Sequence, residues 1–348
     1  FQAVGKYNIG LTAGMETTIV DGSWVEGCNR MDLIMTSSNH SKNTFLNSKF
    51  HKGDDKSNVL EVTKPIEVLI EGLNLDVYKI TKEFNNKELY KKLDSIPEDF
   101  AYLSVGHWMQ GEMGEDRKNI GLTIKAFYEL FKNRKNPPAL ILKCCIVNSS
   151  ILDRSEIQRR IEIIKNGVPD AKTLPKVYLL HGNFTDPEMN ELYNHPKVKA
   201  MVSLTKGEGY GRPLLEFSAI NKPIIATNWS GHIDFLQGDY TTLVGGELEK
   251  VHPTAVIPNM ILAESEWFKP ALKDIGYGFN TVWDDYDNWL EKAKGQGFYS
   301  RKNFSFNSMK EQIKAIFDKN LIKLPKKMDL NIGKIEMPKK PKTKLKKI

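Results

Sequence analysis

The sequence predicts an α/β protein with two domains, each built on a mainly parallel sheet. Short apolar segments that suit buried strands alternate along the chain with longer segments whose apolar residues recur at helical spacing. Such alternation favours a doubly wound sheet, in which ligands bind beyond the C-terminal ends of the strands. A length of 348 residues suits two domains, and 40% apolar with 27% charged residues is typical of a globular protein.

The first domain is predicted over residues 1–97. The expected elements are strands over 7–16, 32–38 and 66–70 and helices over 23–31 and 41–46, the second capped by Asn39. These strands are fewer than a doubly wound domain uses, and no glycine-rich turn precedes Gly10. We therefore expect this domain to be incomplete. Its uncovered sheet edge predicts a homo-oligomer or another partner at this end of the molecule.

The second domain is predicted over residues 98–322, after a polar helical segment at 86–99 and a boundary near Pro97. Strands are expected over 100–106, 139–147, 176–181, 198–204, 224–227 and 242–244. Helices are expected from Ile120, over 153–166, after an Asp186 cap with Pro187 at the first position, from Pro213, and over 267–275, 285–294 and 308–317. The alternation of strand and helix thus continues through the whole domain.

A lysine-rich tail is predicted over residues 323–348. The net charge is +7, but residues 319–348 hold eleven lysines against Asp329 and Glu336, which leaves −2 for residues 1–318. The body of the protein is therefore nearly neutral. The simplest interpretation of the tail is a solvated extension, and attraction to an anionic surface is the alternative.

Composition indicates a cytoplasmic protein. No apolar run approaches the ~20 residues that a membrane span requires, and the N-terminal residues lack the features of a secretory signal. Cys28, Cys144 and Cys145 have the spacing of neither a disulfide framework nor a metal site, so we expect them to pack as small apolar residues in a reducing compartment. The sequence begins with Phe1 instead of Met, and we expect a segment upstream of it to be missing.

The most informative stretch runs from Val202 to Glu216, where an apolar strand leads through a glycine-rich turn into a helix. Gly207, Gly209 and Gly211 let the backbone turn tightly and approach a ligand. Glu208 and Glu216 are eight positions apart, one on the loop and one in the predicted first turn of the helix. A carboxylate can accept hydrogen bonds from two vicinal hydroxyls of a sugar or a ribose, and amides at a helix start suit a phosphate.

Two cations stand at another helix start. Arg117 and Lys118 precede the helix predicted from Ile120, where positive charge is unfavourable unless an anion is bound. We therefore consider both residues candidate ligands of a diphosphate. Glu16, at the end of the first predicted strand, is a candidate for the acceptor side of the cleft, although an acid that ends a strand and caps the next turn is the simpler and preferred interpretation.

The stretch 202–216, together with 223–236, resembles the E-x7-E signature of retaining nucleotide-sugar glycosyltransferases of the family-4 type. This resemblance implies the GT-B fold of two Rossmann-like domains. It assigns Glu208 to the donor sugar, Glu216 to the nucleotide ribose and Lys118 to the donor phosphates, with Glu208 and Lys118 as the residues that support the chemistry. The remaining donor contacts that it implies are Gly209, Tyr210, Gly211, Leu214, Ser230 and Gly231. The family's phosphate-binding arginine falls on His107, so either His107 or Arg117 would supply the second phosphate contact.

The function that follows is transfer of a sugar from a nucleotide-sugar donor to an acceptor, with retention of the anomeric configuration. The sequence has no Asp-x-Asp motif in a matching context, so we expect no metal and no cofactor, with a nucleoside diphosphate as product. The acceptor stays open among glycans, lipid-linked molecules and others. A nicotinamide dehydrogenase is disfavoured because the glycines lack the G-x-G-x-x-G spacing. A non-enzymatic interaction protein built on a degenerate transferase fold stays open as the alternative.

Overall fold

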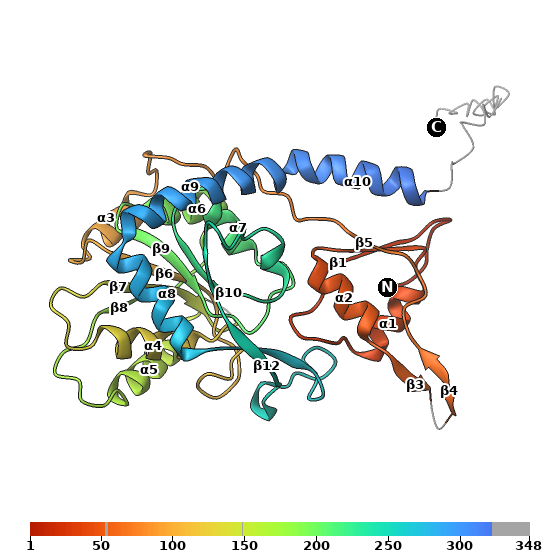
Figure 1. Ribbon diagram of the computed structural model, residues 1–348, viewed down its shortest axis with the longest axis horizontal. Helices are drawn as coiled ribbons and strands as arrows, with labels where there is room; N and C mark the ends of the chain where they lie inside the picture. The colour runs from red at the N-terminus through yellow and green to blue at the C-terminus, as the bar shows by residue number, and fades with distance from the viewer. Residues whose placement is uncertain (53–54, 148, 322–348) are drawn as a thin grey trace, which may run out of the picture.

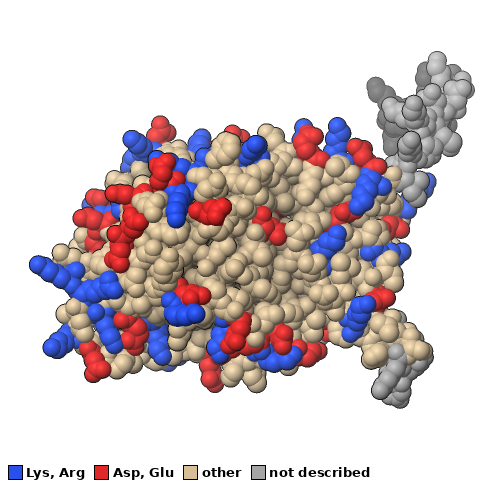
Figure 2. All heavy atoms as spheres, in the orientation of Figure 1, with Lys and Arg blue, Asp and Glu red and all other residues tan. Residues whose placement is uncertain are grey.

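The computed structural model describes residues 1–52, 55–147 and 149–321, so the predicted tail over 323–348 lies outside the described residues. Two α/β units lie side by side, and each has its own parallel sheet (Figure 1). None of the described helices combines the length and the apolar character that crossing a membrane requires. On the face drawn in Figure 2, basic and acidic side chains of the described residues are interspersed.

The first unit contains a parallel sheet of three strands in the order β1-β2-β5. The strands are β1 (Ile9–Thr12), β2 (Leu33–Thr36) and β5 (Ile66–Val68), and the helices are α1 (Gly22–Asn29) and α2 (Asn39–Asn47). Buried apolar side chains from these helices and from β2, such as Val25, Ile34 and Phe45, form its core. In this order β1 is an edge strand, with one side open to pairing. Self-association through β1 stays a prediction.

Several details of the first unit differ from the prediction. The strand predicted over 7–16 has only four residues, because the backbone beyond Thr12 turns toward the second unit. The N-cap of α2 is Ser38 and not Asn39, since the Ser38 hydroxyl accepts a hydrogen bond from the Ser41 amide at 3.1 Å. The hairpin of β3 (Phe50–Lys52) and β4 (Asp55–Leu60) was not predicted, because its residues are mostly polar and show no alternation.

The second unit is built on a six-stranded parallel sheet in the order β11-β10-β9-β6-β7-β8. Its strands are β6 (Ala101–His107), β7 (Ala139–Cys145), β8 (Val177–Leu180), β9 (Val198–Ser203), β10 (Ile224–Thr227) and β11 (Thr242–Val244). This is the order of doubly wound folds, and the direction of the connections reverses between β6 and β9. The predicted α/β fold with parallel sheets is confirmed.

Helices cover both faces of this sheet (Figure 1). Side chains of α4 (Ile120–Phe131), α5 (Ile151–Asn166) and α8 (Leu272–Asp284) pack with strand residues such as Tyr102 and Leu140 on one face. Side chains of α3 (Lys87–Asp94), α6 (Asp186–Asn194) and α7 (Arg212–Ser218) pack with strand residues such as Leu103 and Ile141 on the other. Successive strand residues therefore alternate between two buried faces, as expected for a parallel sheet.

The helix predicted over 267–275 is wrong. Residues 266–270 form β13 (Glu266–Pro270), which pairs antiparallel with β12 (Gly246–Lys250), and α8 begins only at Leu272. Pro270 disfavours a helix through this segment, and Trp267 is fully buried in a small cluster with Val251 and Ile261. Tertiary packing and the proline therefore decide the conformation here.

Two predicted helix starts are also corrected. The N-cap of α6 is Thr185 and not Asp186, and Thr185 forms a capping box with Glu188, so Pro187 occupies the second helical position. Helix α7 begins at Arg212, one residue before the predicted Pro213. As a result Glu216 lies in the second turn of α7 and not in its first.

The last helices join the two units. Helix α9 (Tyr286–Asn303) packs on the second unit, and α10 (Phe306–Asn320) extends over the sheet of the first (Figure 1). Ile316 of α10 is buried against Leu33 and Leu69, and Gln312 Oε1 accepts a hydrogen bond from the Ile70 amide at 3.0 Å. The domain boundary near Pro97 stays a prediction.

Candidate functional site

A cavity of about 430 Å³ lies between the two units, at the point where the strand connections of the larger sheet reverse. Its walls come from the segment after β1, from the ends of β6 and β7, and from the loop between β9 and α7. Eight of the residues predicted for the site line it: Glu16, His107, Arg117, Lys118, Glu208, Gly209, Tyr210 and Gly211. The strand-end position is the one where doubly wound sheets bind ligands.

The glycine-rich loop is in direct contact with the first unit. A Cβ atom on Gly207 would lie 1.9 Å from the carbonyl oxygen of Glu16, and one on Gly209 would lie 2.5 Å from that of Ala13. The Gly209 carbonyl accepts hydrogen bonds from the hydroxyls of Ser38 and Ser41. These glycines are therefore required for the close approach of the two backbones.

Ser230 and Gly231 are hydrogen-bonded to the backbone of the glycine-rich loop. The Ser230 hydroxyl accepts a hydrogen bond from the Glu208 amide at 2.9 Å, and the Gly231 amide donates to the Glu208 carbonyl at 2.9 Å. Neither residue is among the described residues that line the cavity. The structure therefore places them so that they fix the backbone of Glu208.

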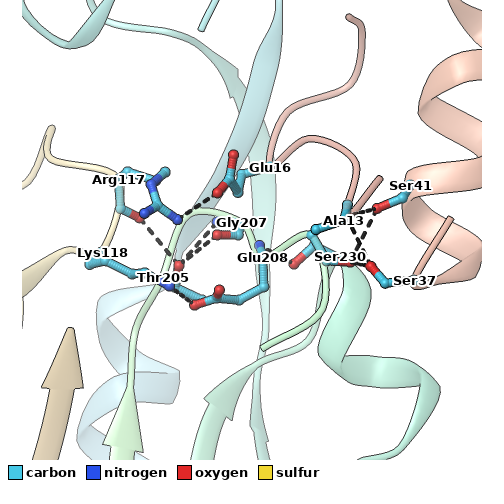
Figure 3. Close-up of polar contacts among 11 residues, drawn as sticks. Ala13, Glu16, Ser37, Ser41, Arg117, Lys118, Thr205, Gly207, Glu208 and Ser230 are labelled. Atoms are coloured by element: carbon cyan, nitrogen blue, oxygen red, sulfur yellow. Dashed lines mark hydrogen bonds and ion pairs between the residues drawn. The ribbon is translucent and has the colours of Figure 1, made fainter. Parts of the chain in front are cut away.

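Lys118 and Glu208 form a hydrogen-bonded ion pair at the cavity wall (Figure 3). Their side chains are only 13% and 10% exposed. Burial by itself would raise the pKa of Glu208, but the charges of Lys118 and Arg117 outweigh it and hold that pKa below its usual range. Glu208 is therefore a carboxylate at neutral pH.

A second ion pair crosses from one unit to the other. Arg117 Nη1 lies 2.8 Å from Glu16 Oε1, and both side chains are mostly buried (Figure 3). The Arg117 carbonyl in turn accepts a hydrogen bond from the Lys206 amide at 2.8 Å. The segment that carries Arg117 and Lys118 is thus tied to the first unit by a side chain and to the glycine-rich loop by its backbone.

Asn119 follows Lys118 and is hydrogen-bonded to the segment that leads into the glycine-rich loop. Sequence reasoning missed this residue. Its backbone is left-handed, with φ 51° and ψ 37°, a conformation that asparagine tolerates better than most residues. Its fully buried side chain donates a hydrogen bond to the Leu204 carbonyl at 2.8 Å. An asparagine immediately before a helical pattern was the available signal.

Lys206 is a second anchor that sequence reasoning missed. Its side chain is 2% exposed, and its ammonium lies 2.5 Å from Glu249 Oε1 and 3.4 Å from Glu115 Oε2. It also lies 5.1 Å from the centre of the Trp267 ring. The glycine-rich loop is therefore fixed to the β12–β13 ribbon by a buried charge.

Glu216 and Leu214 are not among the described residues that line the cavity. Leu214 is part of the apolar core. Glu216 Oε2 accepts a hydrogen bond from the Tyr193 hydroxyl at 3.0 Å, and Glu216 Oε1 lies 3.3 Å from Arg212 Nε. Burial raises the pKa of Glu216 despite the opposing effects of Arg212 and Tyr193.

His107 lies at the exposed end of β6. Its Nδ1 is 3.4 Å from the Ile146 carbonyl oxygen and 3.4 Å from Cys145 Sγ. The cavity also has lining residues that were not predicted, namely Glu71, Lys143, Cys145, Met189 and Arg212. Of these residues, only Lys143 had a signal in the sequence, because it is a lysine within the otherwise apolar strand predicted over 139–147.

No protein-family model and no curated protein sequence matches this sequence. Solved structures are similar in fold. A glycosyltransferase from Rickettsia africae has a TM-score of 0.57 and 17% identity, over 91% of this chain and 71% of that chain. Anabaena Alr3699/HepE, solved in complex with UDP and glucose, has a TM-score of 0.57 and 14% identity, over 89% and 71%.

Sucrose-phosphate synthase from Thermosynechococcus elongatus is a third similar structure, with a TM-score of 0.56 and 12% identity, over 85% of this chain and 60% of that chain. The sequence identities are low, so the likeness to these three proteins concerns the fold alone. This chain therefore has the GT-B fold, with two Rossmann-like units built on parallel sheets.

Proposed function

We propose that this protein is a glycosyltransferase that moves a sugar from a nucleotide-sugar donor to an acceptor, with retention of the anomeric configuration and without a metal ion. The observation that carries the proposal is the ion pair of Lys118 with Glu208 in the cavity between the two units of the GT-B fold. The Anabaena protein of the same fold was solved with UDP and glucose and with UDP-glucose, which supports a nucleotide-sugar donor.

In this proposal, the departing nucleoside diphosphate is stabilised by cations. Negative charge that develops on the leaving group requires positive charge fixed in place beforehand. Lys118 lies at the cavity wall for this role, and its present partner is the Glu208 carboxylate. A donor phosphate that binds Lys118 replaces this carboxylate and frees Glu208 to accept hydrogen bonds from sugar hydroxyls. The charges of Lys118 and Arg117 lower the pKa of Glu208 and so keep its carboxylate ionised before the donor binds.

Retention follows, in this proposal, from transfer on the same face of the sugar as the leaving group, where a diphosphate oxygen helps to deprotonate the acceptor. Glu208 then orients the sugar and is not the nucleophile. Glu16 comes from the first unit and faces the same cavity, so it belongs on the acceptor side. Glu216 lies behind the cavity lining, so in this proposal it holds the ribose from the second turn of α7 once the partly exposed Arg212 side chain moves aside.

Binding and turnover test the proposal. UDP, GDP, ADP and UDP-glucose are compared in a thermal-shift assay, in which a ligand at about 100 times its Kd adds about 2.7 kcal/mol to the free energy of unfolding. NMR of the product from an α-linked donor is expected to show an α-linkage, with unchanged activity in EDTA. A β-linked product, or activity that EDTA abolishes and Mg²⁺ restores, contradicts the proposed mechanism. The absence of binding by every nucleotide contradicts the function itself.

A further inference from the structure

The charges of the side chains that line the cavity do not sum to zero. They comprise four cations and three carboxylates: Arg117, Lys118, Lys143 and Arg212, with Glu16, Glu71 and Glu208. Three of the cations have carboxylate partners. Arg117 pairs with Glu16, Lys118 with Glu208, and Arg212 with Glu216 and, at 4.0 Å, with Glu71. Lys143 forms no ion pair with a described residue, so it carries the excess positive charge of the cavity.

Lys143 is held in a defined position at the cavity edge. It lies near the end of β7, in register with Val105 of β6, which also lines the cavity. Its ammonium donates a hydrogen bond to the Gly182 carbonyl at 2.6 Å and lies 4.6 Å from the centre of the Phe184 ring. Of the three protons of the ammonium, Gly182 uses one, and the other two have no hydrogen-bond acceptor among the described residues and can bind a ligand.

Burial lowers the pKa of Lys143, which means that the surroundings of its ammonium do not fully compensate the charge that water would stabilise. A phosphate would supply that compensation. Lys118 approaches the same region from the loop before α4, and its Cγ would lie 3.4 Å from a Cβ atom built on Gly106, near the end of β6. The two lysines therefore flank the end of β6.

We propose that Lys143 binds a phosphate of the donor diphosphate and is the second phosphate cation of this site. The inference rests on the proposed function and adds a residue that the sequence resemblance did not assign. It also answers which residue takes the place of the arginine that is His107 in this chain. The His107 ring is exposed and its Nδ1 faces Ile146 and Cys145, while Arg117 is engaged with Glu16.

Isothermal titration of three variants tests the proposal. Lys143→Met removes the charge and keeps most of the side-chain length, Lys143→Arg keeps the charge, and Lys125→Met removes a charge from an exposed position on α4. We expect Lys143→Met to weaken UDP at least tenfold and pyrophosphate similarly, with uridine affinity unchanged. Lys143→Arg is expected to retain most of the affinity for UDP, and Lys125→Met all of it.

The outcomes separate the alternatives. If Lys143→Met weakens uridine as much as UDP, Lys143 contacts the base and the phosphate assignment is overturned. If Lys143→Met binds UDP as well as Lys125→Met does, the inference fails while the proposed function stands. If the unmodified protein binds none of UDP, GDP, ADP and pyrophosphate, both fail. A circular-dichroism melt of each variant checks that the fold is retained, and the uridine affinity of Lys143→Met provides a second control within the same variant.

Discussion

Two glutamates from one sequence motif have different electrostatic surroundings. Glu208 is paired with Lys118 in the cavity wall, and its pKa is lowered on balance. Glu216 is buried behind the cavity lining, where Tyr193 and Arg212 hold its two oxygens and burial raises its pKa. An anionic ligand can thus replace Glu208 as the partner of Lys118, whereas Glu216 is held by protein groups.

This difference predicts distinct effects for two substitutions. Glu208→Gln removes the partner of Lys118, so UDP is expected to bind equally well or more tightly, while UDP-glucose loses a charged acceptor worth about 1.5–3 kcal/mol, or roughly 10- to 100-fold. Glu216→Gln is expected to weaken both ligands alike. Calorimetric Kd values for UDP and UDP-glucose measure this, and equal losses of both ligands in both variants would contradict the assignment.

Tyr193 is expected to tune Glu216. Its hydroxyl donates to the Glu216 carboxylate and lowers the pKa of that group, so Tyr193→Phe should raise it further. In the proposed role, the carboxylate form of Glu216 accepts hydrogen bonds from ribose hydroxyls, and in Tyr193→Phe this form is lost at a higher pH. We therefore expect the UDP affinity of Tyr193→Phe to fall between pH 7 and pH 5 more steeply than that of the unmodified protein, and to approach it near pH 8.

Tyr178→Phe is the matched control for this prediction, because it removes a hydrogen bond to Glu98 at 3.0 Å, away from the cavity. Its pH profile is expected to follow that of the unmodified protein. A Tyr193→Phe profile that is displaced equally at every pH would indicate a structural effect without a change in the pKa of Glu216.

Among the elements, those with strong local signals were predictable from the sequence. The apolar segments that became β9, β10 and β11 are buried strands near their predicted bounds. The segment at 266–270 was mistaken for a helix because its conformation depends on pairing with β12, whose residues lie some twenty positions earlier. The hairpin of β3 and β4 has no apolar alternation for a pattern to detect.

The same distinction applies to the site. Glu208, Lys118 and Arg117 were found from their positions relative to a glycine turn and a helix start, which are local features. Asn119 and Lys206 were missed because their partners, the Leu204 carbonyl and Glu249, are distant in sequence. Long-range contacts of this kind leave little trace in a single sequence.

The attachment of the glycine-rich loop to the β12–β13 ribbon gives a prediction for stability. Lys206 and Lys269 both pair with Glu249, but their side chains are 2% and 57% exposed. Lys206→Met is expected to lower the free energy of unfolding by about 1–3 kcal/mol, because it leaves a partly buried carboxylate short of a partner. Lys269→Met, the control, is expected to cost about 0–1 kcal/mol. Urea unfolding measures both, and equal costs would show that burial of Lys206 contributes nothing.

In the whole molecule, two sets of contacts hold the units together, one made by α10 and one next to the cavity. Helix α10 joins them at the outside, through Ile316 against Leu33 and through a 2.7 Å ion pair of Lys319 with Glu67. At the cavity, serine hydroxyls of the first unit bind the Gly209 carbonyl, and Asp234 accepts a hydrogen bond from the Asn39 amide at 2.8 Å. The arrangement of the groups that line the cavity therefore depends on contacts that neither unit makes alone.

The ion pair between Arg117 and Glu16 connects this arrangement with donor binding. Glu16 neutralises a cation that faces the cavity and at the same time helps to hold the units together. Glu16→Gln is expected to tighten UDP binding by about 1 kcal/mol, or roughly fivefold, because the anion no longer competes with a carboxylate. Transfer is expected to slow, because the contact between the units is weaker and the donor and acceptor are less well aligned.

Steady-state kinetics and calorimetry separate these two effects, since KM for the donor should fall or stay constant while kcat falls. The gain in affinity should also shrink in high salt, where charges near the surface are screened. Glu61→Gln is the matched control, because Glu61 pairs with Lys49 within the first unit at an exposed position and should change neither quantity. Weaker UDP binding by Glu16→Gln would mean that the closed arrangement of the units contributes more to donor affinity than the released charge of Arg117, and that Glu16 acts chiefly as a link between the units.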